Sequence, residues 1–394
     1  MAFLDNVAGT KPDSRVVDKM LPFLTEHYGN PSAHFYPLGR ESFEAVQEAR
    51  KQVAALIGAE EEEIIFTSCG TESNNLAVKG VLKRQDGKKK HVIISEIEHF
   101  SVQNPLISFM NDGYEITKLK VADNGLINLE DLKKAIRPDT ALVSVMLGNP
   151  EIGTVQFNEE IGRICKEKGV IYHIDAVAGA GHMEIDVNRL NCDLLSLASQ
   201  NFYGPRGAAA LYIRKGTKVA SLMQGGHQEF GYRSGSENVA AIVGMGEAAR
   251  IAKEEMHIYS VEMKRLSKRL WDGLANMFDF LHFTGHPERR LPGHVSFWIE
   301  FIEGESLLMW LALKGIYAAS GSACSSNILA EDEEDLQASP VLTAVGVPSD
   351  ICAGSITFSL SRYTTDEEVD KVLEELPGIV KRLCEMSPAY NRGN

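Results

Sequence analysis

The stretch "NEEIGRICKEKGVIYHID", residues 158–175, decides the fold class, because a helical pattern leads directly into an apolar run typical of a buried strand. A second such run, "TALVSVML" at 140–147, precedes it. Strands joined through helices require crossover connections, which produce a parallel sheet covered by helices on both faces. Further short, strand-like apolar runs occur at 63–67, 91–95 and 208–213. We therefore expect an α/β fold with a largely parallel sheet.

The pattern changes from about residue 260 onward. A charged amphipathic segment at 260–278 leads into the strand-like "HVSFWIEF" (294–301), and a closing helix is expected from Asp366. This is an α+β layout. With 394 residues, two domains are the best expectation.

Composition excludes several classes of partner and location. The net charge is −14 and no basic stripe is present, which argues against nucleic-acid binding. No apolar run approaches the roughly 18 residues that a membrane span needs, and no signal peptide is recognisable. The 6 cysteines form no CxxC pair and no zinc spacing, as in proteins with reduced thiols. We expect a cytoplasmic protein without a membrane or nucleic-acid partner.

Two strand ends carry residues that could bind a phosphate in one case and a ring nitrogen in the other. Gly70 and Thr71 precede a helix whose N-terminus could seat a phosphate, although Thr71 or Ser73 could equally serve as a plain N-cap. Asp175 ends a buried strand, where a carboxylate could keep a pyridine nitrogen protonated or could cap the following loop. His99 could stack on such a ring or be structural.

Later segments offer an anion contact, a thiol and a guanidinium. "GGHQEFGYRSGSENV" (225–239) is Gly-rich, and its Ser236 could reach an anion, or the segment could be a surface loop. Cys324 stands among small residues in "SGSACSSN" (320–327), which suits an exposed nucleophilic thiol. Arg362 follows a strand and could bind a carboxylate through two hydrogen bonds. The acidic run 330–337 reads as an exposed loop or a frayed helix.

Taken together and in this order, these stretches resemble the cysteine desulfurases of the IscS/NifS type, which are class V aminotransferase-like enzymes of PLP fold type I. The resemblance also covers "FLDNVAGTK" (3–11), "YGNPSAHFYPLGR" (28–40) and "SRYTTDEEVDK" (361–371), and hence nearly the whole chain. It implies a homodimer and a mostly parallel seven-stranded sheet with helices on both faces. It also implies a large PLP-type domain at 13–255 and a small α+β domain made of 1–12 and 256–394, which carries the Cys324 loop.

The resemblance assigns roles to individual residues. In the family a lysine binds PLP as an aldimine, and a loop cysteine receives sulfur from free cysteine as a persulfide. Carried over by position, the cofactor-binding residues are Gly70, Thr71, His99, Asp175 and Ser236 of the partner subunit. Arg362 corresponds to the residue that binds the substrate carboxylate, and Cys324 to the catalytic sulfur acceptor. Cys69, where the family usually has glycine, is either part of a functional thiol or metal pair or a small buried cysteine.

The stretch "SLASQNFYGPRG" (196–207) departs from the family pattern, which reads Ser-x-His-Lys where this chain reads Ala198-Ser199-Gln200-Asn201. An amide nitrogen such as that of Asn201 cannot form a Schiff base, and Gln200 cannot exchange a proton near neutral pH. Ala198 lacks a hydroxyl that the family directs to the phosphate. Ala178 replaces a glutamine, and Pro150 replaces an asparagine beside the substrate. We therefore expect the PLP aldimine to be lost.

Four functional hypotheses follow. The first is a desulfurase-like protein of iron–sulfur cluster assembly or sulfur transfer that forms no PLP aldimine. Cys324 would then serve as persulfide carrier or as ligand of an Fe–S cluster, facing an Fe–S scaffold or sulfur-acceptor protein. The second is an active cysteine desulfurase, converting L-cysteine to L-alanine and a persulfide, with PLP held non-covalently. The third is a regulatory subunit of an active paralogue. The fourth is another reaction in the altered pocket, with a carboxylate substrate bound by Arg362.

Overall fold

The computed structural model describes residues 1–394 except 86, 321–338, 349–354, 389 and 391–394. The predicted α/β fold is confirmed. Its main sheet has 7 strands in the order β2-β8-β7-β6-β5-β3-β4. Strand β8 is antiparallel to both of its neighbours, and the other paired strands run parallel. The strands are β2 (Ile64–Thr67), β3 (His91–Ser95), β4 (Glu115–Leu119), β5 (Thr140–Ser144), β6 (Ile171–Asp175), β7 (Leu194–Ala198) and β8 (Ala209–Ile213).

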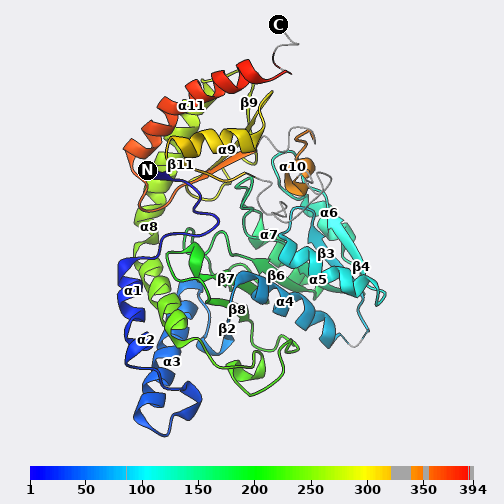
Figure 1. The fold of residues 1–394 in the computed structure, drawn as a ribbon. Helices are drawn as coiled ribbons and strands as arrows, with labels where there is room; N and C mark the ends of the chain where they lie inside the picture. The colour runs from blue at the N-terminus through cyan, green and yellow to red at the C-terminus, as the bar shows by residue number, and fades with distance from the viewer. Residues whose placement is uncertain (86, 321–338, 349–354, 389, 391–394) are drawn as a thin grey trace.

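Helices cover both faces of this sheet, because alternate strand residues point to opposite sides. Val143 of β5 belongs to the core beneath α3, α7 and the first half of α8, whereas the adjacent Leu142 packs with α4 and α5 on the other face. The helices involved are α3 (Pro37–Ile57), α4 (Gly70–Arg84), α5 (Phe100–Met110), α6 (Leu129–Ala135), α7 (Asn158–Lys168) and α8 (Val239–Ala275). The short helices α1 (Ser14–Met20) and α2 (Pro22–Thr25) lie beside α8 (Figure 1).

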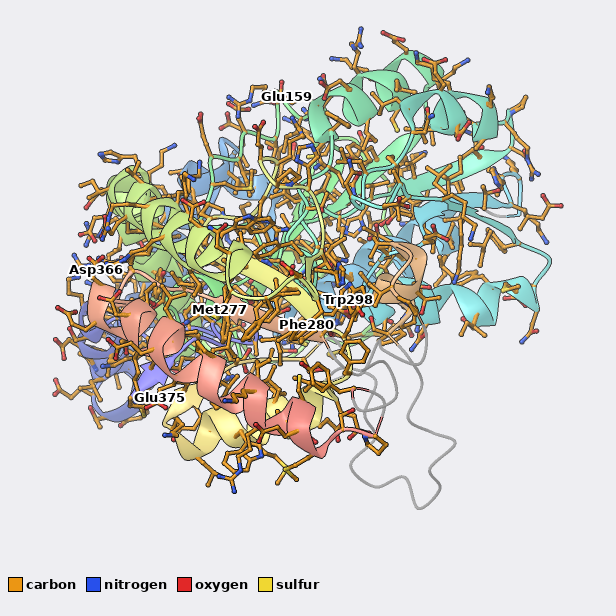
Figure 2. The ribbon with its side chains drawn as sticks, turned by 90° about the horizontal axis from the view of Figure 1, so that it is seen from above. Glu159, Met277, Phe280, Trp298, Asp366 and Glu375 are labelled. Carbon is orange, nitrogen blue, oxygen red and sulfur yellow. The ribbon has the colours of Figure 1, made fainter. Side chains whose placement is uncertain are left out.

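A second layer joins the two ends of the chain. Strands β12 (Ser355–Ser359), β10 (His294–Ile299) and β9 (Leu281–Phe283) form an antiparallel sheet, and β1 (Ala2–Phe3) pairs in parallel with β11 (Ile316–Tyr317). Helices α9 (Gly304–Leu313) and α11 (Asp366–Met386) complete a separate apolar core, while the short α10 (Pro340–Ala344) lies in another cluster. Figure 2 shows Asp366 and Glu375 along α11, with Met277 and Phe280 where the chain passes from α8 toward β9.

Helix α8 connects the two layers. Most of its buried residues up to Ala252 belong to the core of the large sheet, and those from Leu266 onward belong to the core of the second layer. Figure 1 shows this long helix running from beside α3 up to α11. Within the described part of the chain, no helix is both long and apolar enough to cross a membrane.

Candidate functional site

A cavity of about 430 Å³ lies where the parallel strands of the main sheet end. Asp175 and Ala198, the last residues of β6 and β7, line it, and so do Glu98 and His99, which follow β3. Thr357 of β12 contributes from the second layer. The carboxyl ends of strands in an α/β sheet are where such folds bind ligands, because the connecting loops and helix N-termini converge there.

The cavity brings together most of the predicted site residues, although they lie far apart in the sequence. Four of the five predicted cofactor-binding residues line it, namely Gly70, Thr71, His99 and Asp175, and so do the five departures from the family pattern, Pro150, Ala178, Ala198, Gln200 and Asn201. Cys69 also lines the cavity and is half-buried. These positions are facts of the fold; the roles assigned to them remain predictions.

Asp175 is held in place by two hydrogen bonds and is only 7% exposed. Its Oδ1 accepts from the Val177 backbone N–H at 3.0 Å, and its Oδ2 accepts from Asn74 Nδ2 at 2.6 Å. The carboxylate therefore caps the following loop and also lines the cavity, whereas its role toward a pyridine nitrogen stays a prediction. Burial raises the pKa of Asp175. Sequence reasoning missed Asn74, whose signal is its place one helical turn after Gly70.

The N-terminus of α4 opens onto the cavity. Cys69 is its N-cap residue and makes no side-chain capping bond, so the prediction that Thr71 or Ser73 caps this helix is wrong. The reason is local: the Ser73 hydroxyl is engaged by Thr67 Oγ1 at 2.7 Å. At Gly70, an added Cβ would lie 2.7 Å from Val177 Cγ2, so the close packing there requires glycine. Free N–H groups at this end can receive an anion.

His99 and Glu98 are neighbours in the chain, and both line the cavity. His99 is the N-cap of α5, and its Nδ1 accepts from the Ser101 N–H at 3.1 Å. Glu98 is fully buried; its Oε1 accepts from Ser95 Oγ at 2.5 Å and from the Met146 N–H at 2.9 Å, and its Oε2 has no partner. Burial raises the pKa of Glu98 to about 8. Sequence reasoning did not single out this acid.

Asn201 ends the short 3-10 helix Ser199–Asn201 that follows β7. Its side chain is almost wholly buried, and its Nδ2 donates to the Val7 carbonyl oxygen at 2.9 Å. Its Oδ1 has no hydrogen-bond partner. No lysine and no arginine is among the described residues that line the cavity. The described lining therefore contains no primary amine.

Arg362 does not line the cavity. Its Nη2 donates to Glu255 Oε2, its Nη1 lies 3.5 Å from Asp13 Oδ2, and its guanidinium lies 5.1–5.7 Å from the ring centres of Tyr203, Tyr259 and Tyr363. Hydrogen bonds from Arg15 and then from Arg362 lower the pKa of Glu255 to about 2. In this conformation the guanidinium is engaged by carboxylates of the chain itself, and carboxylate binding by Arg362 remains a prediction.

The remaining predicted residues lie away from this cavity or outside the described chain. Ser236 is exposed and does not line the cavity of its own chain. Cys324, predicted as sulfur acceptor and possible Fe–S ligand, lies outside the described residues, as does the acidic run 330–337. Among the residues that are described, no group of three or more His, Cys, Asp or Glu side chains is arranged to hold a metal ion.

Comparison with known proteins decides the family. The sequence profile described as aminotransferase class-V matches residues 2–372. The chain is 47% identical to "Cysteine desulfurase IscS" of Methanosarcina thermophila, an alignment that covers 98% of this chain and 93% of the relative. The chain belongs to the cysteine desulfurase family of class-V aminotransferases. "Cysteine desulfurase" of Homo sapiens is 43% identical over 98% of this chain and 83% of its own length.

Solved structures agree with this family assignment. A structure titled "NIFS-LIKE PROTEIN" superposes with a TM-score of 0.89 at 35% identity and covers 97% of this chain and 99% of its own. A second, "Apo structure of Cysteine Desulfurase from Thermococcus onnurineus NA1", superposes with a TM-score of 0.86 at 25% identity and covers 97% of this chain and 95% of its own. The PLP fold type I that the sequence predicts is thereby confirmed.

Members of this cysteine desulfurase family depend on PLP, and part of the donor set in the cavity fits that coenzyme. Asp175, supported by Asn74, is a buried carboxylate suited to a pyridinium N–H, and the α4 N-terminus at Gly70 is suited to a phosphate. His99 provides a ring that lines the cavity. The described lining does not fit a covalent attachment, because Asn201 offers an amide instead of a primary amine.

Proposed function

We propose that this cysteine desulfurase-family chain serves sulfur transfer in iron–sulfur cluster assembly, with Cys324 as the sulfur carrier and without a covalent link to PLP. The observation that carries the proposal is Asn201, a buried amide at the end of β7 in a cavity whose described lining has no lysine. An amide lone pair is delocalised into the carbonyl, so it does not condense with an aldehyde. Membership of the family supports the sulfur chemistry.

The transfer step needs only a thiolate and a persulfide donor. The Cys324 thiolate attacks the outer sulfur of a donor persulfide R–S–SH, the donor S–S bond breaks, and R–S⁻ leaves as Cys324 becomes a persulfide. The proton on the outer sulfur stays with it, and no external oxidant or reductant is consumed. An Fe–S scaffold or sulfur-acceptor protein would then take the sulfur by the same exchange. Ligation of an Fe–S cluster by Cys324 is the other use of this thiolate.

A second candidate is an active cysteine desulfurase with PLP held non-covalently, and the names of the relatives favour it. Bound PLP would supply an electron sink for reactions at the substrate Cα. The residues of this chain that would hold it are Asp175 at the ring nitrogen, His99 at the ring face, and the N–H groups at Gly70 and Thr71 around the phosphate. Among the described lining residues, His99 and Glu98 are side chains that can move a proton, whereas Gln200 cannot.

Domain organisation and assembly complete the proposal. We place the division between a large domain at 13–255 and a small one at 1–12 and 256–394, which is supported by the change of core along α8 between Ala252 and Leu266. A homodimer is supported by exposed aromatic residues near the N-terminus, among them Tyr28 and Phe35 at 74% and 81% exposure. A cytoplasmic location remains a prediction from the sequence.

The deciding experiment measures sulfur on Cys324. The purified full-length protein is incubated anaerobically with glutathione persulfide, and separately with L-cysteine plus PLP, and sulfane sulfur is located by peptide mass spectrometry. The proposal expects a persulfide on Cys324 from the first donor, lost in Cys324→Ser and kept in the control Cys69→Ser. Alanine and sulfide formed from L-cysteine would favour the second candidate. If Cys324 carries no sulfane sulfur after either incubation, the carrier role is overturned.

A further inference from the structure

A second pocket, of about 640 Å³, lies between the C-terminal end of α4 and the loop that follows β8. Among the described residues, none lines both this pocket and the cavity at the strand ends. The loop is fixed on α4, because the Ala220 backbone N–H donates to the Gly80 carbonyl oxygen at 2.9 Å. At Gly80 an added Cβ would lie 2.4 Å from Val219 Cγ1, so this close approach requires glycine. The fold thus builds this pocket from segments that lie far apart in the sequence.

The charged side chains of this pocket are cations. Arg84, in the last turn of α4, and Lys218, in the loop, both line it and are exposed. Within the described chain neither of them forms a salt bridge, and no aspartate or glutamate is among the described lining residues. The whole chain, in contrast, has a net charge of −14. Two cations without carboxylate partners favour an anionic ligand, because no existing ion pair has to break when it binds.

An exposed aromatic ring lines the same pocket. Phe230 is 56% exposed, and its φ of 55° is a left-handed conformation that is strained for a residue with a side chain. The buried Arg50 supports the ring, with its guanidinium 5.1 Å from the ring centre. A strained backbone that keeps an apolar ring in water is unfavourable for folding, and such strain concentrates at functional sites. A ring held in this way is suited to stack on a planar ligand.

Hydroxyl groups and the volume of the pocket narrow the ligand further. Thr217 and Tyr232 also line the pocket, and a hydroxyl can donate a hydrogen bond to a phosphate oxygen. A space of about 640 Å³ is typical of sites for small molecules. The matching ligand therefore combines a planar ring with two adjacent negative groups, one for each cation.

We propose that this pocket binds a nucleoside diphosphate, with the base stacked on Phe230 and the phosphates bound by Arg84 and Lys218. Each cation donates a charge-assisted hydrogen bond to a phosphate, and the base replaces water on the aromatic ring. The site is independent of the proposed function, since it involves neither Asn201 nor Cys324. Helix α4 joins the two regions: Arg84 is its last residue, and Gly70, its first, lines the cavity at the strand ends.

Binding of three probes to the wild-type full-length protein tests the proposal. The probes are ADP, adenosine and inorganic pyrophosphate, which carry both recognised groups, the base alone and the anion alone. Dissociation constants are measured by isothermal titration calorimetry at one ionic strength, with the protein in the oligomeric state in which it is purified. We expect ADP to bind at least about tenfold more tightly than either of the other probes. Pyrophosphate binding as tightly as ADP would show a simple anion site and overturn the nucleotide assignment, and so would the absence of ADP binding.

Single variants with a matched control assign the two parts of the ligand to their side chains. Arg84→Met and Lys218→Met should each weaken ADP binding about tenfold, because each removes one charged hydrogen bond. The control Lys83→Met removes the same charge from the neighbouring residue of α4, which does not line the pocket, and should change ADP affinity by less than about twofold. Equal effects of Arg84→Met and Lys83→Met would contradict direct phosphate contact.

The aromatic contact has its own variant. Phe230→Leu should weaken ADP binding about tenfold and leave pyrophosphate binding unchanged, since only the base stacks on the ring. An equal loss for both probes would show that the variant disturbs the pocket as a whole, and an unchanged ADP affinity would contradict stacking. If Phe230→Leu fails to fold, as judged by circular dichroism, the three probes on the wild type still decide.

Discussion

Replacement of Glu229 by glutamine should destabilise the protein more strongly than any single exposed charge change. Glu229 Oε1 and Oε2 each accept from Arg50 at 2.8 Å, and Oε2 also accepts from the Phe66 N–H at 2.7 Å. Both side chains are almost fully buried, with exposures of 4% for Arg50 and 3% for Glu229. Breaking a buried pair by removing one charge leaves the other uncompensated and costs about 3–5 kcal/mol.

The local backbone makes this pair important for the Gly-rich segment. Glu229 and Phe230 both have positive φ, 48° and 55°, which is strained for residues with side chains. The ion pair holds that conformation just before the stretch that ends at Ser236. Loss of the pair should therefore release the segment as well as weaken the core near β2.

Thermal unfolding followed by circular dichroism measures the effect. Glu229→Gln should lower the melting temperature by roughly 4–6 °C, because the unfolding entropy of a chain of this length converts a loss of about 3–5 kcal/mol into a shift of that size. The double variant Arg50→Met with Glu229→Gln should recover part of the loss, since no buried charge is then left alone. The control Asp272→Asn removes one partner of the exposed pair with Lys268 and should change little. A Glu229→Gln melting temperature within about 2 °C of the wild type would refute this reasoning.

Three further predictions concern the site. Asn201→Lys restores an amine but leaves the other four departures from the family pattern in place, and each of these removes a contact worth on the order of 1 kcal/mol. Sulfide release from cysteine by this variant should therefore stay at least about a hundredfold below that of a lysine-bearing relative. Full activity would show that these four departures matter little. Cys324→Ser should abolish persulfide or cluster binding and leave the melting temperature unchanged, because the residue is predicted on a loop; undiminished sulfur or iron would count against its role. The pKa of Glu98 rises from an ordinary 4.5 to about 8 on folding, so its contribution to the free energy of unfolding falls as pH increases from about 4.5 to 8. The free energy of unfolding of Glu98→Gln should therefore increase relative to that of the wild type over this pH range. Parallel curves of unfolding free energy against pH would contradict a buried acid at this position.

Much of the fold could be predicted because its strands are buried on both faces. Residues 91–95, 171–175 and 209–213 are mostly apolar runs for that reason, and the structure places strands there. Strand β4 was missed because it lies at the edge of the sheet, where Glu115 and Lys118 are exposed and the apolar pattern is weak. The beginning of α8 was missed because it is buried almost throughout and so lacks the amphipathic pattern.

The candidate site was predictable only in part. The order of motifs led to Gly70, Asp175 and Asn201, which the fold brings to one cavity. Partners distant in sequence could not be found that way: Asn74 lies 101 residues from Asp175, and Glu255 lies 107 residues from Arg362. No local pattern encodes such pairs, since they arise only when strand ends and helices meet in the folded chain.

The most direct test of the central claim is the intact mass of the wild-type protein after incubation with PLP and reduction with borohydride. A coenzyme bound through a lysine becomes permanently attached under these conditions, whereas one held by hydrogen bonds is removed on denaturation. Because the wild type has no lysine at position 201, we expect its unmodified mass, and a single coenzyme adduct for Asn201→Lys. A stoichiometric adduct on any lysine of the wild-type chain would contradict it.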